Sequence, residues 1–199
     1  MQLNFSPLPI ATIILVVINV LIFGAGYALK SSDEIILNYG FIPDQLFKDN
    51  SHHLEDIMTR LVSSMFIHAN IAHLIFNLIS LMYLGGFAER SVGIPRYLTI
   101  YFAAGISGAL FHGVMASYVL GNGYNILIGA SGAISGVLGI AAALGNVRGY
   151  YWLAMQILFA AFGSFTSISI AFLAHVGGFL AGLFLTKLMI ILERKRLRA

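Results

Sequence analysis

The sequence predicts an all-α, polytopic membrane protein built as a bundle of six transmembrane helices. Apolar residues make up 59% of its 199 residues and charged residues only 10%, a balance well outside the range of soluble domains. The mean hydropathy is +0.89. The apolar residues form stretches close to the ~20 residues that a helix needs to cross a bilayer. We therefore expect a single membrane domain over residues 1–199.

Six apolar stretches are candidates for the spans. The first is not expected to be a signal peptide, because MQLNFSPLP lacks a basic residue and the apolar run exceeds the usual ~7–15 residues. The last two share one stretch, 149–186, without Asp, Glu, Lys or Arg, and GSFTSIS (163–169) offers a polar break within it. The predicted spans are residues 9–29, 69–88, 97–118, 126–146, 150–168 and 171–192.

The charged residues predict the orientation. The loop between the first two spans, residues 31–67, holds six of the eight acidic residues. Basic residues gather after the second and fourth spans and at the C-terminus, so the positive-inside rule places both termini in the cytoplasm. The 31–67 loop then faces outward, and we expect part of it to fold on the membrane surface. The basic residues concerned are Arg90, Arg96, Arg148, Arg194, Lys195, Arg196 and Arg198.

In this topology the second, fourth and sixth spans enter from the outside, and their first residues share one depth. His73 and Asn77 of HANIAHLIFN are four residues apart and point the same way on a helix. Ser131 is expected about five residues into the fourth span, ~8 Å deep. His175 is expected a few residues into the sixth. Because an imidazole within a membrane segment is costly, these groups together predict a functional site.

Glycines predict close packing around this site. Four of them fall within about 80° on the fourth span, and two on the sixth share an arc of about 60° with His175. Such stripes let a neighbouring helix approach closely, and His175 would face the helix that packs there. The glycines are Gly129, Gly132, Gly136 and Gly139, and Gly178 and Gly182.

A serine hydroxyl becomes a good nucleophile when a base accepts its proton. The bases expected near Ser131 are His175, His73 and His112. The acidic residues lie in the outer loop or, for Glu89 and Glu193, at the cytoplasmic end. A Ser-His dyad is therefore favoured over a triad. Histidine and asparagine side chains, backbone N–H groups and the start of a helix all suit a developing oxyanion.

These residues resemble the rhomboid family of intramembrane serine proteases. The resemblance runs over about residues 60–182, includes GGFAERSVG (85–93), and implies a six-helix bundle of rhomboid type. Its motifs are His68-x4-His73-x3-Asn77, Gly129-Ala130-Ser131-Gly132, and Ala174-His175-x2-Gly178-x3-Gly182.

The resemblance also implies roles. Ser131 would be the nucleophile, His175 the general base and acid, and His73 and Asn77 the oxyanion donors, with backbone around Gly129. Substrates would be transmembrane proteins cut near the outer face after a small residue. The lipid bilayer is a partner, nucleic acid is not, and neither cofactor nor metal is expected. We expect a prokaryotic cell membrane, because no soluble domain is added.

Two positions depart from the family pattern. Thr59 precedes Arg60 where the family often has a Trp-Arg pair. Ser135 stands where many members have an aromatic residue that packs on the base histidine. Another ring is expected to hold His175, such as Phe172, Phe179 or one from the third span.

Other interpretations stay open. One is an inactive rhomboid-like protein that binds membrane helices, although it would usually have lost the serine or the histidine. Another is a transporter or metal channel using His68, His73, His112 and His175, although the spacing of His68 and His73 misses the i, i+4 pattern. Taken singly, each residue also has a structural interpretation. Ser131 would be a packing residue, Asn77 would form an interhelical hydrogen bond, and His68 would brace the outer loop. His112 would lie in the core, and His52 and His53 would be solvated.

Overall fold

The computed structural model describes residues 8–49, 53–163 and 171–197. Over these ranges the chain is helical, and its only β-type pairing is an isolated antiparallel bridge between Phe41 and Leu127. The predicted all-α class is therefore confirmed. The larger helices are α1 (Ile10–Ala28), α5 (Ile71–Val92), α6 (Ile94–Met115), α7 (Ser131–Ala143), α8 (Arg148–Gly163) and α9 (Phe172–Arg196).

Four of the described helices are long and apolar enough to cross a membrane. Helices α1 and α5 match the first and second predicted spans. Helix α6, with its continuation to Leu120, matches the third, and α9 matches the sixth. Helix α7 is apolar but has 13 residues, and α8 has 16. The expected break at 163–169 lies, beyond Gly163, outside the described residues. The chain is thus a multi-pass membrane protein, and the count of six spans stays a prediction.

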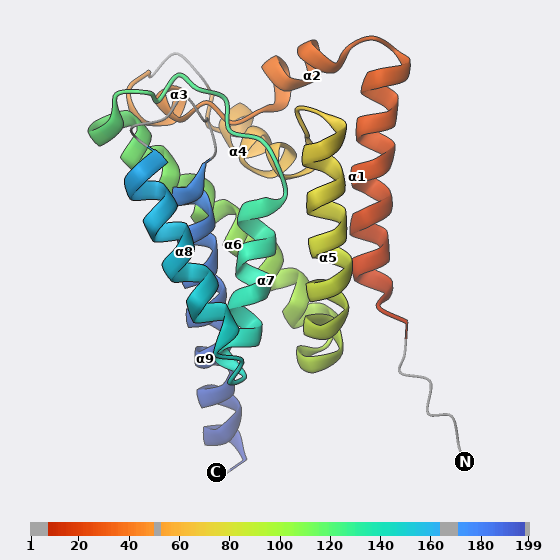
Figure 1. The fold of residues 1–199 in the computed structure, drawn as a ribbon, viewed down its shortest axis with the longest axis vertical. Coiled ribbons are helices and arrows are strands. Elements are labelled where there is room, and N and C mark those ends of the chain that lie inside the picture. Colours follow the sequence, from red (N-terminus) through yellow and green to blue (C-terminus); the bar gives the residue numbers. More distant parts are fainter. Residues whose placement is uncertain (1–7, 50–52, 164–170, 198–199) are drawn as a thin grey trace.

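The helices alternate in direction through the bundle (Figure 1). Helices α5, α7 and α9 start at the end of the bundle that carries the 31–67 segment, whereas α1, α6 and α8 end there. The first residue of α1 and the last residues of α9 lie at the opposite end. The sequence predicted this shared level for the starts of the second, fourth and sixth helices. Side chains from the first turns of α5, α7 and α9 can therefore meet.

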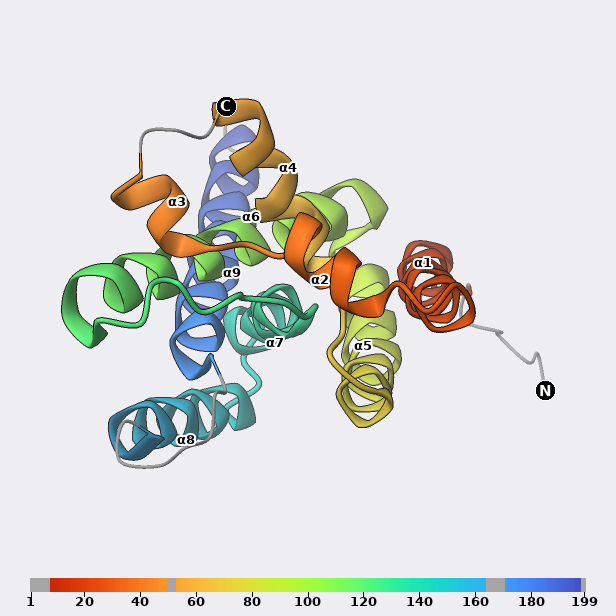
Figure 2. The same ribbon diagram turned by 90° about the horizontal axis from the view of Figure 1, so that it is seen from above.

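Helix α7 lies at the centre of the bundle, with α5, α6, α8 and α9 around it (Figure 2). Ten of its residues are buried, and most are glycine or alanine. On α9, a Cβ on either Gly178 or Gly182 would collide with backbone of α7, at Gly132 or Gly136. The predicted glycine contact is therefore confirmed: α7 and α9 touch backbone to backbone.

The described part of the 31–67 segment is folded, as expected, and lies at the end of the bundle where α5 and α7 start (Figure 1). It contains α2 (Ser32–Tyr39), α3 (Pro43–Phe47), α4 (Leu54–Ser63) and a 3-10 turn over Ser64–Phe66. Arg60 donates from Nη1 to the carbonyls of Leu37 and Gly40, at 2.8 and 3.0 Å. A cation is favourable at the end of a helix, so Arg60 ties α4 to the end of α2.

Helix α1 is attached to α5 by a buried carboxylate. Glu89 accepts hydrogen bonds from the N–H groups of Ala11 and Thr12 and from the Thr12 hydroxyl, at 2.8–3.1 Å. The first N–H groups of a helix lack intrahelical partners, and the start of a helix favours negative charge. Glu89 therefore satisfies the first turn of α1 from the neighbouring helix.

Candidate active site

Ser131 is the first residue of α7 and not, as predicted, about five residues inside a helix. The predicted boundary at 126 was wrong because the backbone before Ser131 pairs with the 31–67 segment. Leu127 exchanges two backbone hydrogen bonds with Phe41, and Gly129 N–H donates to the Ser64 carbonyl at 2.8 Å. Ser131 therefore lies where the N–H groups of a first helical turn have no partner within the helix.

Ser131 and His175 are in hydrogen-bonding contact. The Nε2 of His175 on α9 lies 2.8 Å from the Oγ of Ser131 on α7. Both are half-buried, and both belong to the first turn of their helices. The glycine contact below them keeps α7 and α9 close enough for these short side chains to meet. The two residues that the sequence singled out are thus brought together.

Helix α8 contacts the opposite edge of the His175 ring. The Oε1 of Gln156 lies 2.8 Å from His175 Nδ1, and Gln156 is buried. The Trp152 ring lies 6.0 Å from the imidazole between centroids, and Phe172 contacts it edge-on at 6.1 Å. The expected contact with Phe172 is confirmed, whereas Phe179 stacks on Trp152. Gln156, Trp152 and Phe172 thus surround the ring from α8 and α9.

Sequence reasoning missed Gln156 and Trp152. A signal was present, because Gln156 is an uncharged polar side chain in the middle of an apolar helix and such residues are costly in a membrane. Its partner could not be predicted, since no spacing relates α8 to His175. Ser135, at the position of the missing aromatic residue, donates instead to the Ser131 carbonyl at 2.6 Å.

His73 lies beside Ser131, next to the turn that precedes it. Gly129 has a φ of +116°, and a Cβ there would stand 2.7 Å from His73 Nε2. Asn77 is buried, and its amide donates to the His73 carbonyl at 2.8 Å. One amide hydrogen of Asn77 is left for another acceptor. The N–H of Gly129 is already bonded to Ser64, so Gly129 supplies the shape of the turn rather than a free donor.

The remaining histidines lie around this group. The His68 ring contacts His73 edge-on, 4.9 Å between centroids. Burial, and to a lesser extent the neighbouring His73, lowers the pKa of His68 to about 4. In the described ranges, the Nδ1 of His112 on α6 is buried without a hydrogen-bond partner. His53 is exposed at the start of α4, and His52 lies outside the described residues.

The residues that the structure describes contain no group of three or more His, Cys, Asp or Glu side chains able to hold a metal ion. No three of His68, His73, His112 and His175 therefore form such a group.

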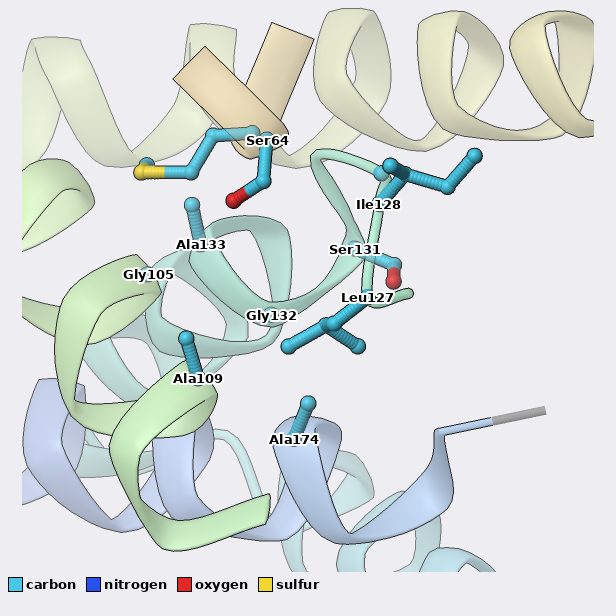
Figure 3. A pocket seen from close by; sticks show the side chains of 11 residues that line it. Ser64, Gly105, Ala109, Leu127, Ile128, Ser131, Gly132, Ala133 and Ala174 are labelled. Atoms are coloured by element: carbon cyan, nitrogen blue, oxygen red, sulfur yellow. The ribbon is translucent and has the colours of Figure 1, made fainter. Parts of the chain in front are cut away.

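A small cavity of about 20 Å³ opens beside Ser131 (Figure 3). Small residues from α6, α7 and α9 form about half of its wall, and Ser64, Ser131, Met65, Leu127 and Ile128 line it as well. One water molecule needs at least ~10–15 Å³ by this measure, so the cavity has room for a methyl-sized group. The small wall residues are Gly105, Ala109, Gly132, Ala133 and Ala174.

The fold and this site define a class: a helical multi-pass membrane protein with a serine–histidine pair of the kind that serine hydrolases use. The Rhomboid domain matches residues 55–191. The chain belongs to the rhomboid family.

Curated relatives agree with this family. The chain is 35% identical over 145 residues to rhomboid protease GluP of Bacillus subtilis, which covers 69% of this chain and 27% of the relative. It is 33% identical to RHOMBOID-like protein 5 of Arabidopsis thaliana, over 63% of this chain and 42% of the relative. It is 32% identical to rhomboid protease GlpG of Yersinia enterocolitica, over 68% of this chain and 49% of the relative. The match thus spans less than half the length of these relatives.

Proposed function

We propose that this protein is an intramembrane serine endopeptidase that hydrolyses peptide bonds in or near transmembrane segments through a dyad of Ser131 and His175. The 2.8 Å contact between His175 Nε2 and Ser131 Oγ carries the proposal. Membership of the rhomboid family supports it. A base within hydrogen-bond reach of a serine hydroxyl is the arrangement that activates this nucleophile.

In this mechanism His175 Nε2 accepts the Ser131 proton while Oγ bonds to the substrate carbonyl carbon. The resulting tetrahedral intermediate carries an oxyanion. When it collapses, the C–N bond breaks and His175 returns the proton to the leaving amine. Water then attacks the acyl ester while His175 accepts one of its protons. The C–Oγ bond breaks, the carboxylic acid product leaves, and His175 passes that proton to Ser131 Oγ.

The oxyanion would be bound by the free N–H groups at the start of α7, with His73 and Asn77 as side-chain donors. The proximity of His73 Nε2 to Gly129 supports its role. The dipole of α7 favours negative charge at this point. Removing one such donor typically lowers the rate by ~10²–10³, which is the effect we expect for Asn77→Ala.

The proposed substrates are transmembrane proteins with a small residue, such as alanine, at the cut site. The cavity of about 20 Å³ beside Ser131 supports this, since it has room for a methyl-sized side chain. We further propose that both termini are cytoplasmic and that cutting occurs near the outer face of a prokaryotic cell membrane. The distribution of basic residues supports that orientation.

The test uses purified protein in liposomes with a reporter transmembrane substrate that has Ala-Gly near its outer end. We expect cleavage by wild type, loss of cleavage in Ser131→Ala and in His175→Ala, and no effect of EDTA. Cleavage that survives Ser131→Ala would refute the nucleophile. A wild-type protein that binds several such substrates and cuts none would instead favour the inactive, helix-binding alternative.

A further inference from the structure

We infer that Gln156 is a positioning residue for His175: it accepts a hydrogen bond from Nδ1–H and so holds the imidazole in the tautomer whose Nε2 lone pair faces Ser131. This inference deepens the proposed function and rests on it. Both ring nitrogens of His175 have a partner at 2.8 Å, Gln156 from α8 at Nδ1 and Ser131 from α7 at Nε2. The ring is thus held between two helices that approach it from different sides.

The tautomer decides whether His175 can act as a base. A neutral imidazole has one N–H and one lone pair, and the amide oxygen of glutamine is only an acceptor. With Oε1 opposite Nδ1, the proton lies on Nδ1 and Nε2 can accept the Ser131 proton. With the proton on Nε2 instead, the imidazole would donate to Ser131 and could not activate it. An acceptor opposite Nδ1 is therefore needed, and Gln156 provides it.

Helix α8 is built to keep this acceptor in place. Trp152, Gln156 and Phe159 recur at i, i+4 and i+7, so they share one face of the helix. Trp152 stacks on Phe179 with ring centroids 6.0 Å apart, and Phe159 contacts Phe172 at 5.5 Å. Both partners are on α9, where Phe172 precedes His175 in the sequence and Phe179 follows it. The amide of Gln156 is thus set between two aromatic contacts that fix α8 against α9.

A neutral amide suits this position better than the carboxylate that completes the usual serine protease triad. Gln156 is 6% exposed, and a buried charge in a membrane segment is costly. The amide sets the tautomer and the ring orientation without adding a charge. It leaves the imidazolium that forms during the reaction without an ionic partner, so orientation is its contribution.

The test compares three full-length variants in detergent micelles. Gln156→Met keeps the length of the side chain and removes the acceptor, and Gln156→Glu keeps an acceptor. Asn19→Leu is the matched control, because Asn19 is another buried amide, bonded within α1 to the Leu15 carbonyl. The measurements are kcat and KM on the reporter substrate, the rate of labelling by a fluorophosphonate, and the thermal unfolding midpoint.

We expect Gln156→Met to lower kcat and the labelling rate ~10–100-fold, as loss of an orienting partner does elsewhere, with KM within about twofold. Gln156→Glu at pH 8 should be at least about tenfold more active than Gln156→Met. Asn19→Leu should keep wild-type kcat. Equal kcat in Gln156→Met and wild type, or a Gln156→Glu variant no better than Gln156→Met, would overturn the inference.

A second measurement separates this inference from the proposed function. In protein labelled with 15N-histidine, NMR distinguishes a protonated from an unprotonated ring nitrogen, and His175→Ala identifies the signals of His175. We expect Nδ1 to be protonated in wild type and the two tautomers to mix in Gln156→Met. An unchanged tautomer would refute the role of Gln156, even if activity fell. Absence of cleavage and labelling in wild type would refute the protease proposal and leave the tautomer result standing.

Discussion

Gly129 is the residue at which the backbone of the site is most constrained. Its φ of +116° disfavours any side chain, and a Cβ would stand 2.7 Å from His73 Nε2. We therefore expect Gly129→Ala to displace His73 or the turn before Ser131, and to lower kcat by about 10². Cleavage of the reporter substrate measures this loss.

Gly145 offers a matched control for Gly129. It has a φ of +101°, and a Cβ there would meet nothing within 4 Å. Gly145→Ala and Gly129→Ala should each destabilise the fold by ~1–2 kcal/mol through backbone strain, but only Gly129→Ala should lose activity. Comparable activity in the two variants would show that the contact with His73 has no functional role.

His68 links stability to pH. Its pKa in the folded chain is about 4, and an unfolded histidine has a pKa near 6.5. The unfolded state therefore binds the proton first, so stability is full above pH 6.5 and falls as the pH drops from 6.5 towards 4. At pH 4 the free energy of unfolding is lower by about 3 kcal/mol because of His68.

Unfolding of His68→Phe should consequently depend less on pH than unfolding of wild type over that window. The measurement is the thermal midpoint at pH 7, 6, 5 and 4. His53→Gln, which replaces an exposed histidine at the start of α4, is the comparison. Parallel pH profiles for wild type and His68→Phe would contradict the burial argument.

At the level of elements, the contact between α7 and α9 sets the distance between Ser131 and His175. Gly182 is one of the residues at which the two backbones touch, and a Cβ on it would collide with Gly136. Gly182→Ala should separate the helices, lower the unfolding midpoint and slow labelling of Ser131 by a fluorophosphonate. Small-to-large changes in a packed core typically cost 1–3 kcal/mol.

Gly24 provides the control for this contact. A Cβ there would meet nothing within 4 Å, and Gly24 is also within a membrane-spanning helix. Gly24→Ala should be neutral or slightly stabilising, since alanine favours a helix more than glycine does. A Gly182→Ala variant that behaves like Gly24→Ala would show that the α7–α9 approach tolerates another methyl group.

The long helices and the glycine contact could be predicted from the sequence, because hydropathy and spacing along one helix report directly on both. The start of α7 could not. Residues 126–130 are as apolar as a helix would be, and what keeps them out of a helix is the backbone pairing of Leu127 with Phe41 and of Gly129 with Ser64. The contact of Gln156 with His175 was missed for the same reason: it joins two helices that no local pattern relates.

At the level of the whole molecule, one buried carboxylate holds the first turn of α1 against α5. Glu89→Ala would leave the N–H groups of Ala11 and Thr12 without their acceptor. Each buried donor left unpaired costs ~1–3 kcal/mol, so we expect a loss of about 3 kcal/mol in the free energy of unfolding. Thermal unfolding in detergent measures it.

Glu193 is the appropriate comparison for Glu89. It forms an exposed ion pair with Arg96 at 3.2 Å, and such pairs contribute ~0–1 kcal/mol. Glu193→Ala should therefore shift the unfolding midpoint much less than Glu89→Ala. Equal shifts would mean that Glu89 does not hold α1 in place.

The 31–67 segment and the turn before Ser131 are joined by main-chain groups. Phe41 and Leu127 exchange two hydrogen bonds, and Ser64 accepts a third from Gly129. Bonds of this kind are available to almost any residue. The segment can therefore change most of its side chains over evolutionary time while the position of Ser131 is preserved, and relatives of very different outer sequence can keep the same geometry at this serine.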